Sequence, residues 1–149
     1  MSNQVTASIE IDAPRETVFD FMLDPKTLDD WVTIHKKVNS ADSGKAHEGF
    51  CMEQTLCLRK VNFKVKWTLT ECERPERATW EGNGPAYSHA RTAYVVTDLG
   101  GGRTRLDYEN EFKAPGGFLG AAASRALTGG VPEREAKASL AALKRILER

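Results

Sequence analysis

Three polar side chains lie on strand faces that the sequence otherwise makes apolar. Gln54 shares alternate positions with apolar residues of the segment 50–58, and Tyr108 and Asn110 do so in the segment 106–112. Alternate residues of a strand share one face, so we expect all three to point inward. There they could bind or polarise a ligand carbonyl. Alternatively, they bond to neighbouring protein groups, because a buried polar atom without a partner costs about 1 to 3 kcal/mol.

Aromatic residues are the expected walls of such a site, and their rings suit ring-containing and acyl ligands alike. Trp31 ends a short helical segment and is expected at an entrance, whereas Trp67 belongs to a strict alternation and is expected in the core. Phe63, Tyr94 and Phe112 are further wall candidates. The full candidate ligand-binding set is Trp31, Gln54, Phe63, Tyr94, Tyr108, Asn110, Phe112, Leu119 and Ala123.

Metal and cofactor chemistry is not predicted. His35, His47 and His89 are scattered, and none pairs with another histidine or a cysteine at ligand spacing. His35 is nearest the expected entrance, where we expect it to be solvated. The chain has no nucleophile elbow, phosphate-binding loop or dinucleotide fingerprint. If the protein is an enzyme, the catalytic candidates are Tyr108, Asn110, Gln54 and His35.

Composition argues against several classes of protein. The chain has 149 residues, with 21 Lys and Arg against 21 Asp and Glu, so no net field attracts nucleic acid or an anionic membrane surface. No apolar run approaches the roughly 20 residues that span a bilayer, and a signal-peptide pattern is absent. Three cysteines without metal-like spacing indicate reduced thiols. We therefore expect a cytoplasmic single domain over residues 1–149, as a monomer or a homodimer.

The order of the elements predicts an α+β protein. A strand at residues 7–11 precedes a helix that is capped by Asp12 and ends near Met22, and a shorter helical turn covers residues 28–31. Period-two alternation then predicts antiparallel strands at residues 50–59, 61–70, 77–82, 92–96 and 105–113.

The chain after Pro115 reads as helix, with a bend or interruption between Gly129 and Pro132. Leu119 and Ala123 belong to its first apolar stripe. Sheets of this many strands twist and curl, so small helical residues opposite the sheet would leave an internal space. Alternatively, these alanines only reflect the preference of alanine for helices.

Two segments resemble a known family. The stretch Ser8–Met22, followed by Asp24-Pro25 and Trp31, is similar to the opening of the START-related, birch-pollen-allergen-like superfamily (SRPBCC), which includes polyketide cyclases/dehydrases and lipid-transport proteins. The segment Ser139–Lys144 is similar to that family's closing helix. The resemblance implies a helix-grip fold. In that fold a curved antiparallel sheet of about seven strands wraps round a long C-terminal helix, two short helices follow the first strand, and an apolar pocket lies inside.

Three functions fit these expectations. The first is binding of a hydrophobic small molecule, such as a lipid, an isoprenoid or an aromatic polyketide-like compound, by a carrier or sensor. The second is a polyketide cyclase or dehydratase that confines a reactive chain in the same cavity. The third is a protein-interaction module of the chaperone-cofactor type. This third function needs an exposed apolar patch, which the alternating strands do not show.

Overall fold

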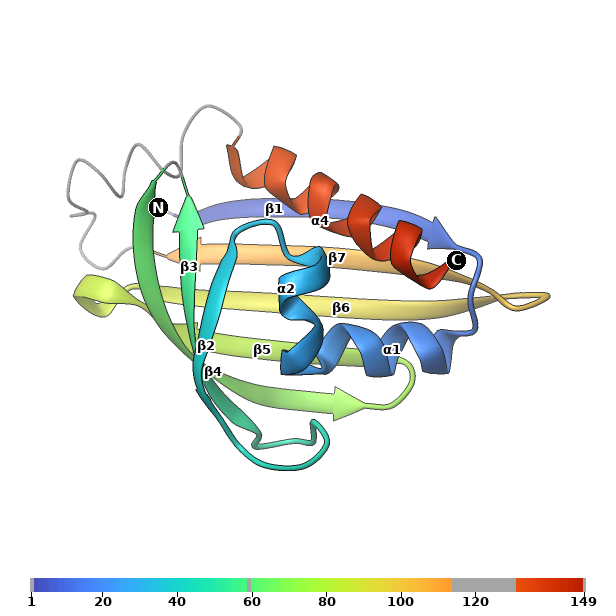
Figure 1. Cartoon of the computed structure of the whole chain (residues 1–149), viewed down its shortest axis with the longest axis horizontal. Coiled ribbons are helices and arrows are strands. Elements are labelled where there is room, and N and C mark those ends of the chain that lie inside the picture. Colours follow the sequence, from blue (N-terminus) through green and yellow to red (C-terminus); the bar gives the residue numbers. More distant parts are fainter. Residues whose placement is uncertain (1, 59, 114–130, 149) are drawn as a thin grey trace.

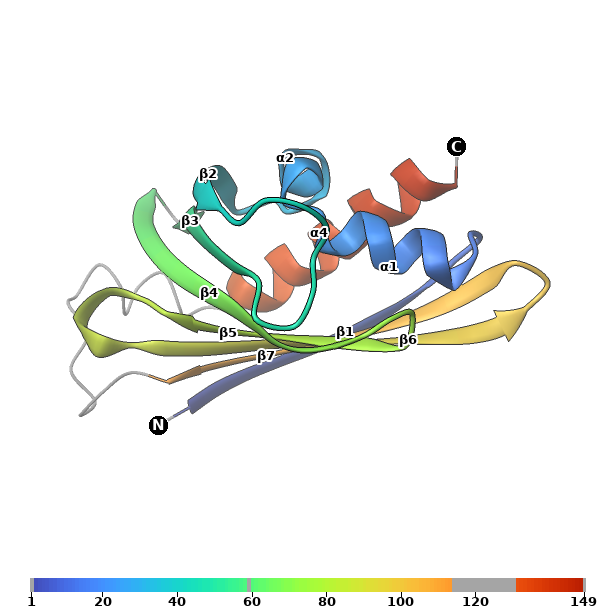
Figure 2. The same cartoon turned by 90° about the horizontal axis from the view of Figure 1, so that it is seen from below.

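Seven antiparallel strands form one sheet in the order β1-β7-β6-β5-β4-β3-β2. The computed structural model describes residues 2–58, 60–113 and 131–148. The sheet bends, so that β2 and β3 rise towards the helices (Figures 1 and 2). The strands are β1 (Ser2–Ile11), β2 (His35–Ala41), β3 (Cys51–Leu58), β4 (Val61–Glu73), β5 (Arg77–Asn83), β6 (His89–Gly100) and β7 (Arg103–Lys113).

Strand β4 shows why these segments are strands. Val65, Trp67 and Leu69 are buried on the concave face, whereas Lys64 and Lys66 are exposed on the other. Such an alternation is typical of a strand in a sheet with one face against the core and the other against water. The burial of side chains alternates in the same way along most of β6.

The predicted start of the first strand is wrong. Strand β1 begins at Ser2 rather than at residue 7, because it pairs with β7 along its whole length, from Ser2 opposite Lys113 to Ile11 opposite Thr104. The added residues are mostly polar, so they have little apolar signal of their own. Only the pairing with a strand from the far end of the chain makes them part of the sheet.

Two short helices follow β1, as predicted. Helix α1 (Arg15–Leu23) buries Val18, Phe19 and Met22, and helix α2 (Leu28–Trp31) follows the short turn η1 (Pro25–Thr27).

The predicted helix cap at Asp12 is wrong. Pro14 occupies the N-cap position of α1 and makes no side-chain hydrogen bond there. The fixed backbone angle of proline suits a helix start. The backbone N–H of Asp12 donates instead to the carboxylate of Glu148, far along the chain.

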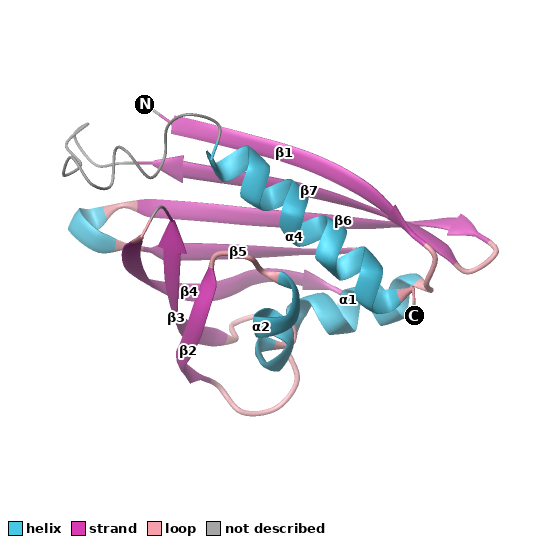
Figure 3. Cartoon of the chain, turned by 45° about the horizontal axis from the view of Figure 1, so that its top comes forward, coloured by secondary structure: helices cyan, strands magenta, loops and turns pink. Residues whose placement is uncertain are grey.

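Helix α4 (Val131–Leu147) lies across the concave face of the sheet, on the same side as α1 and α2 (Figures 2 and 3). Leu140 and Leu143 of α4 are buried in the core. Pro132 is the second residue of α4, and in the first turn of a helix a proline removes no helical hydrogen bond. This arrangement is the helix-grip fold that the sequence predicts. Leu119, Ala123 and the Gly129-Gly130 pair lie outside the described residues.

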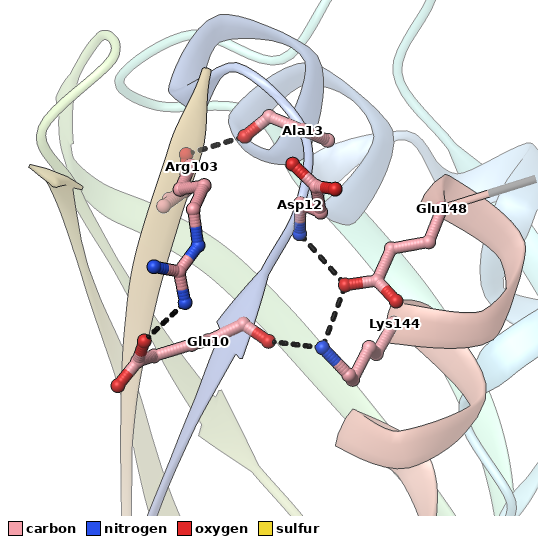
Figure 4. Close-up of polar contacts among 7 residues, drawn as sticks. Glu10, Asp12, Ala13, Arg103, Lys144 and Glu148 are labelled. Atoms are coloured by element: carbon pink, nitrogen blue, oxygen red, sulfur yellow. Dashed lines mark hydrogen bonds and ion pairs between the residues drawn. The ribbon is translucent and has the colours of Figure 1, made fainter. Parts of the chain in front are cut away.

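Polar contacts attach the end of α4 to β1 (Figure 4). The Lys144 ammonium donates to the Glu10 carbonyl at 2.7 Å and to the Glu148 carboxylate at 2.6 Å. Glu148 also accepts the N–H of Asp12 at 2.7 Å, and these donors lower the pKa of its carboxyl. Glu10 in turn pairs with Arg103 of β7 at 2.7 Å. The helix is thereby held at a set position over the sheet.

Candidate functional site

An apolar cavity lies between the concave face of the sheet and α4. Its volume is about 170 Å³. For comparison, an apolar cavity of about 150 Å³ accepts benzene or xenon. The wall consists of Val5, Trp31, Val32, Ile34, Leu56, Phe63, Val65, Trp67, Gly84, Pro85, Ser88, Ala90, Tyr94, Tyr108, Asn110, Phe112, Pro132, Glu135, Ala136, Ser139 and Leu140.

A second cavity of about 100 Å³ adjoins the first. Trp67, Tyr94 and Tyr108 belong to the walls of both. The second cavity extends under α1 and α2, where Met22 and Leu28 line it. The described side chains therefore leave space between the sheet and the helices.

Small residues keep this space open. Ala90 of β6 and Ala136 of α4 line the larger cavity. Gly82 affects this space through the positions of its neighbours. A Cβ atom on Gly82 would lie 2.6 Å from Cε3 of Trp67 and 2.7 Å from Cγ1 of Val65. The missing side chain of Gly82 therefore lets the Trp67 ring lie close against β5.

Four side chains, one each from α2, β2, β3 and β4, form a series of polar contacts. The Trp67 indole N–H, which can only donate, donates to Oε1 of Gln54 at 3.0 Å. Nε2 of Gln54 therefore faces Nδ1 of His35, at 2.7 Å, and donates to it. The proton of the neutral His35 ring is then on Nε2, which lies 3.4 Å from Oδ1 of Asp29. The Gln54 side chain therefore lies between Trp67 and His35, and its two hydrogen bonds set the orientation of its amide.

The expectation of a solvated His35 is wrong. Its side chain is 2% exposed, and it lines neither cavity. The pairing of β2 with β3 shifts register between His35 and Lys37, and Lys36 and Lys37 are both exposed. Such an irregularity redirects side chains that a simple alternation would place elsewhere.

The stability of the protein should depend on the protonation of His35. Burial lowers the pKa of His35 from 6.5, against a smaller opposing effect of Asp29. Between that lowered value and 6.5 the unfolded chain binds more protons than the native protein, so the free energy of unfolding should fall as the pH falls through this window. Urea unfolding at several pH values should show this slope, and His35→Gln should reduce it.

The other two histidines provide the control for this experiment. His47 and His89 are more exposed and remain in the variant. If the slope is unchanged in His35→Gln, protonation of His35 is not the cause of the pH dependence of stability.

Two tyrosines and an amide lie side by side in the cavity walls. The rings of Tyr94 and Tyr108 have centroids 5.6 Å apart. Burial raises the pKa of Tyr94, and it raises the pKa of Tyr108 to about 12 against a smaller opposing effect of the Asn110 amide. The Asn110 amide also donates to Oγ1 of Thr92 at 2.8 Å. Both phenols are therefore neutral near pH 7 and can donate to a ligand oxygen.

The structure brings most of the predicted ligand-binding set together. Trp31, Phe63 and Phe112 lie in the wall of the larger cavity, and Trp31 is buried there. Trp67 is in the core, as predicted, and also lines both cavities. The members of the set within the described residues are Trp31, Gln54, Phe63, Tyr94, Tyr108, Asn110 and Phe112, whose roles in binding stay predictions.

Sequence reasoning missed several wall residues. Ala90 and Ala136 could have been found as small residues on inward faces. Ser88 could not, because it follows the short turn η2 (Pro85–Tyr87), where no alternation exists. Glu135 was missed because a glutamate on a helix is ordinarily on the wet side.

The described residues offer neither a metal-binding cluster nor a membrane-spanning helix. No group of three or more His, Cys, Asp or Glu side chains among them is placed to hold a metal ion. Within the same part of the chain, no helix combines the length and the apolar character needed to cross a bilayer.

Comparison with known proteins agrees with this architecture. A family model described as polyketide cyclase/dehydrase and lipid transport matches residues 2–148. The Zhui aromatase/cyclase from Streptomyces sp. R1128 has a TM-score of 0.76 and 20% identity, over 100% of this chain and 95% of that one. A START superfamily protein from Mycobacterium smegmatis has a TM-score of 0.74 and 11% identity, over 97% of each chain. At these identities the likeness shows the fold.

Curated relatives match over a shorter stretch. The proteins named Toxin MT0934 and Toxin Rv0910, from two strains of Mycobacterium tuberculosis, are 26% identical to this chain over 81 residues. The match covers 54% of this chain and 56% of each relative, so it spans about half the length of the curated relatives.

Proposed function

Because the chain belongs to the polyketide cyclase/dehydrase and lipid transport family, we propose that it binds a hydrophobic small molecule in its internal cavity, as a carrier or a sensor. The observation that supports this function best is the unfilled apolar space of about 170 Å³ between the sheet and α4. A soluble core is normally packed to the density of an organic crystal. Apolar walls with a few polar groups are typical of a ligand site.

Native mass spectrometry of the purified protein tests this proposal. A lipid, an isoprenoid or an aromatic compound of defined mass should remain bound, and hydrophobic compounds should raise the midpoint of thermal unfolding. Binding stabilises the native state by about 2.7 kcal/mol when the ligand is at 100 times its Kd. Repeated absence of a bound species, with no stabilisation by any member of a hydrophobic library, would contradict the proposal.

A second candidate function is cyclisation or dehydration of a reactive chain held in the same cavity. The neighbouring Tyr108 and Asn110 side chains favour it, because a neutral phenol beside an amide in the cavity wall can donate to a substrate carbonyl. The cavity would restrict the chain to a few conformations, which lowers the entropic part of the barrier. Gln54 is the other cavity residue with an oriented amide.

Tyr108→Phe separates the two candidates. If Tyr108 donates to a reacting carbonyl, the variant should lose about 100-fold or more in kcat on a substrate, with Kd changed far less. Steady-state kinetics and direct binding measurements give the two values. Asn110→Leu should show the same pattern if the amide beside the phenol also binds the reacting carbonyl. Equal losses of binding and turnover in both variants would favour a binding role alone.

A further inference from the structure

Two residues that line the larger cavity carry a buried polar atom with no hydrogen-bond partner among the described residues. Nε1 of Trp31 and Oγ of Ser88 are buried and make no hydrogen bond within the described part of the chain. Both residues line the larger cavity, and their exposed fractions are 4% for Trp31 and 1% for Ser88. A folded protein rarely leaves buried donors unpaired, so each such group requires an explanation.

The donor of Trp31 is the more informative of the two. A serine hydroxyl can turn towards another acceptor, but an indole N–H moves only with the whole ring. The backbone after Trp31 is held by the N–H of Val32, which donates to the Leu28 carbonyl, and by that of Thr33, which donates to Oγ of Ser139 on α4. The Thr33 hydroxyl also donates to the Glu135 carboxylate. The backbone next to Trp31 is therefore held to α2 and α4, and the ring itself is buried.

Charge in the walls limits what the cavity can accept. Among the described residues that line either cavity, none is Lys, Arg or His, and Glu135 is the one charged residue. A ligand carboxylate would enter without a counter-ion and would meet the like charge of Glu135. Burial of an unpaired ion is strongly unfavourable. The polar group of the ligand is therefore expected to be uncharged.

We propose that the ligand of the larger cavity is a neutral, mostly apolar molecule whose ketone, ester or ether oxygen accepts a hydrogen bond from Nε1 of Trp31. This inference rests on the proposed binding function and adds to it the chemical class of the ligand. The indole cannot accept a hydrogen bond, so the cavity selects an acceptor at this point. A ligand of this kind would give the buried N–H of Trp31 the acceptor that the described residues do not supply.

Octanophenone and octylbenzene form a matched pair of probes, because they differ only in a carbonyl in place of a methylene group. Their Kd values are measured by calorimetry on the wild-type protein, Trp31→Phe and Ser88→Ala. The wild type should bind the ketone about threefold to tenfold more tightly, as one neutral hydrogen bond predicts. In Trp31→Phe the preference should vanish or reverse, because the carbonyl would be buried without a donor. The affinity for octylbenzene should change much less.

A second measurement does not depend on the variant. The indole N–H resonance of Trp31 in the wild-type protein should move downfield when octanophenone binds, and it should move less with octylbenzene. The inference is overturned if the wild type binds both probes equally, or if Ser88→Ala rather than Trp31→Phe removes the preference. Failure of the wild type to bind either probe would contradict the proposed function itself.

Methyl decanoate and sodium decanoate test the charge of the ligand. At neutral pH the ester should bind at least tenfold more tightly than the carboxylate, since the described walls offer it no cation. Equal or tighter binding of the carboxylate would overturn the neutral class.

Discussion

Ala136→Trp should abolish binding of hydrophobic ligands while the protein stays folded. Ala136 is half-buried on α4 and lines the larger cavity of about 170 Å³, so an indole at this position would occupy the space that the ligand needs. Loss of on the order of 100 Å² of buried apolar ligand surface corresponds to about 2.5 kcal/mol, or nearly a 100-fold rise in Kd. Competition with a fluorescent hydrophobic probe measures the affinity.

Ala138→Trp is the matched control on the same helix. Ala138 is exposed, so its replacement adds the same side chain without entering the cavity. Circular dichroism and thermal unfolding should show both variants folded, with a cost of about 1 to 3 kcal/mol at most for overpacking in Ala136→Trp. Unchanged ligand affinity in a folded Ala136→Trp protein would mean that the ligand lies elsewhere.

Gly82→Ala should lower the free energy of unfolding by about 1 to 3 kcal/mol, although it adds a single methyl group. The new Cβ would lie 2.6 Å from Cε3 of Trp67 and 2.7 Å from Cγ1 of Val65, distances that force the ring to move. Movement of Trp67 would also disturb its hydrogen bond to Gln54, at 3.0 Å. Urea unfolding gives the loss of stability, and the indole N–H resonance of Trp67 reports the disturbed bond.

Gly84→Ala is the matched control for this prediction. A Cβ on Gly84 would lie 2.7 Å from Oγ of Ser88, which is the end of a side chain that can rotate. We therefore expect a much smaller loss of stability. If the two variants lose the same stability, the contact with Trp67 is not the cause of the cost.

Much of the fold is predictable because its signals are local. The alternation in β4 sorts Val65, Trp67 and Leu69 from the lysines between them, and the same rule places Gln54, Tyr108 and Asn110 on the inward face. The start of β1 and the contact of Asp12 were not predictable in this way. Both depend on partners from the other end of the chain, β7 and Glu148.

The residue types of the candidate site were predictable from the sequence, but the contacts between these residues were not. The inward aromatic residues and the apolar character of the space follow from residue type and period. His35 shows the limit, because its burial depends on an irregular pairing of β2 with β3 and on the amide of Gln54. The sequence also does not predict that the Trp31 N–H lacks a partner among the described residues, because no residue pattern indicates which donors lack an acceptor.

The sequence by itself determined which faces are apolar and which elements exist, because hydrophobic burial acts on each strand and helix through its own periodicity. Only the tertiary structure decided how much space those faces leave between them and which polar atoms meet inside it. Those outcomes depend on the curl of the sheet and on the position of α4. Both result from contacts between residues far apart in the chain.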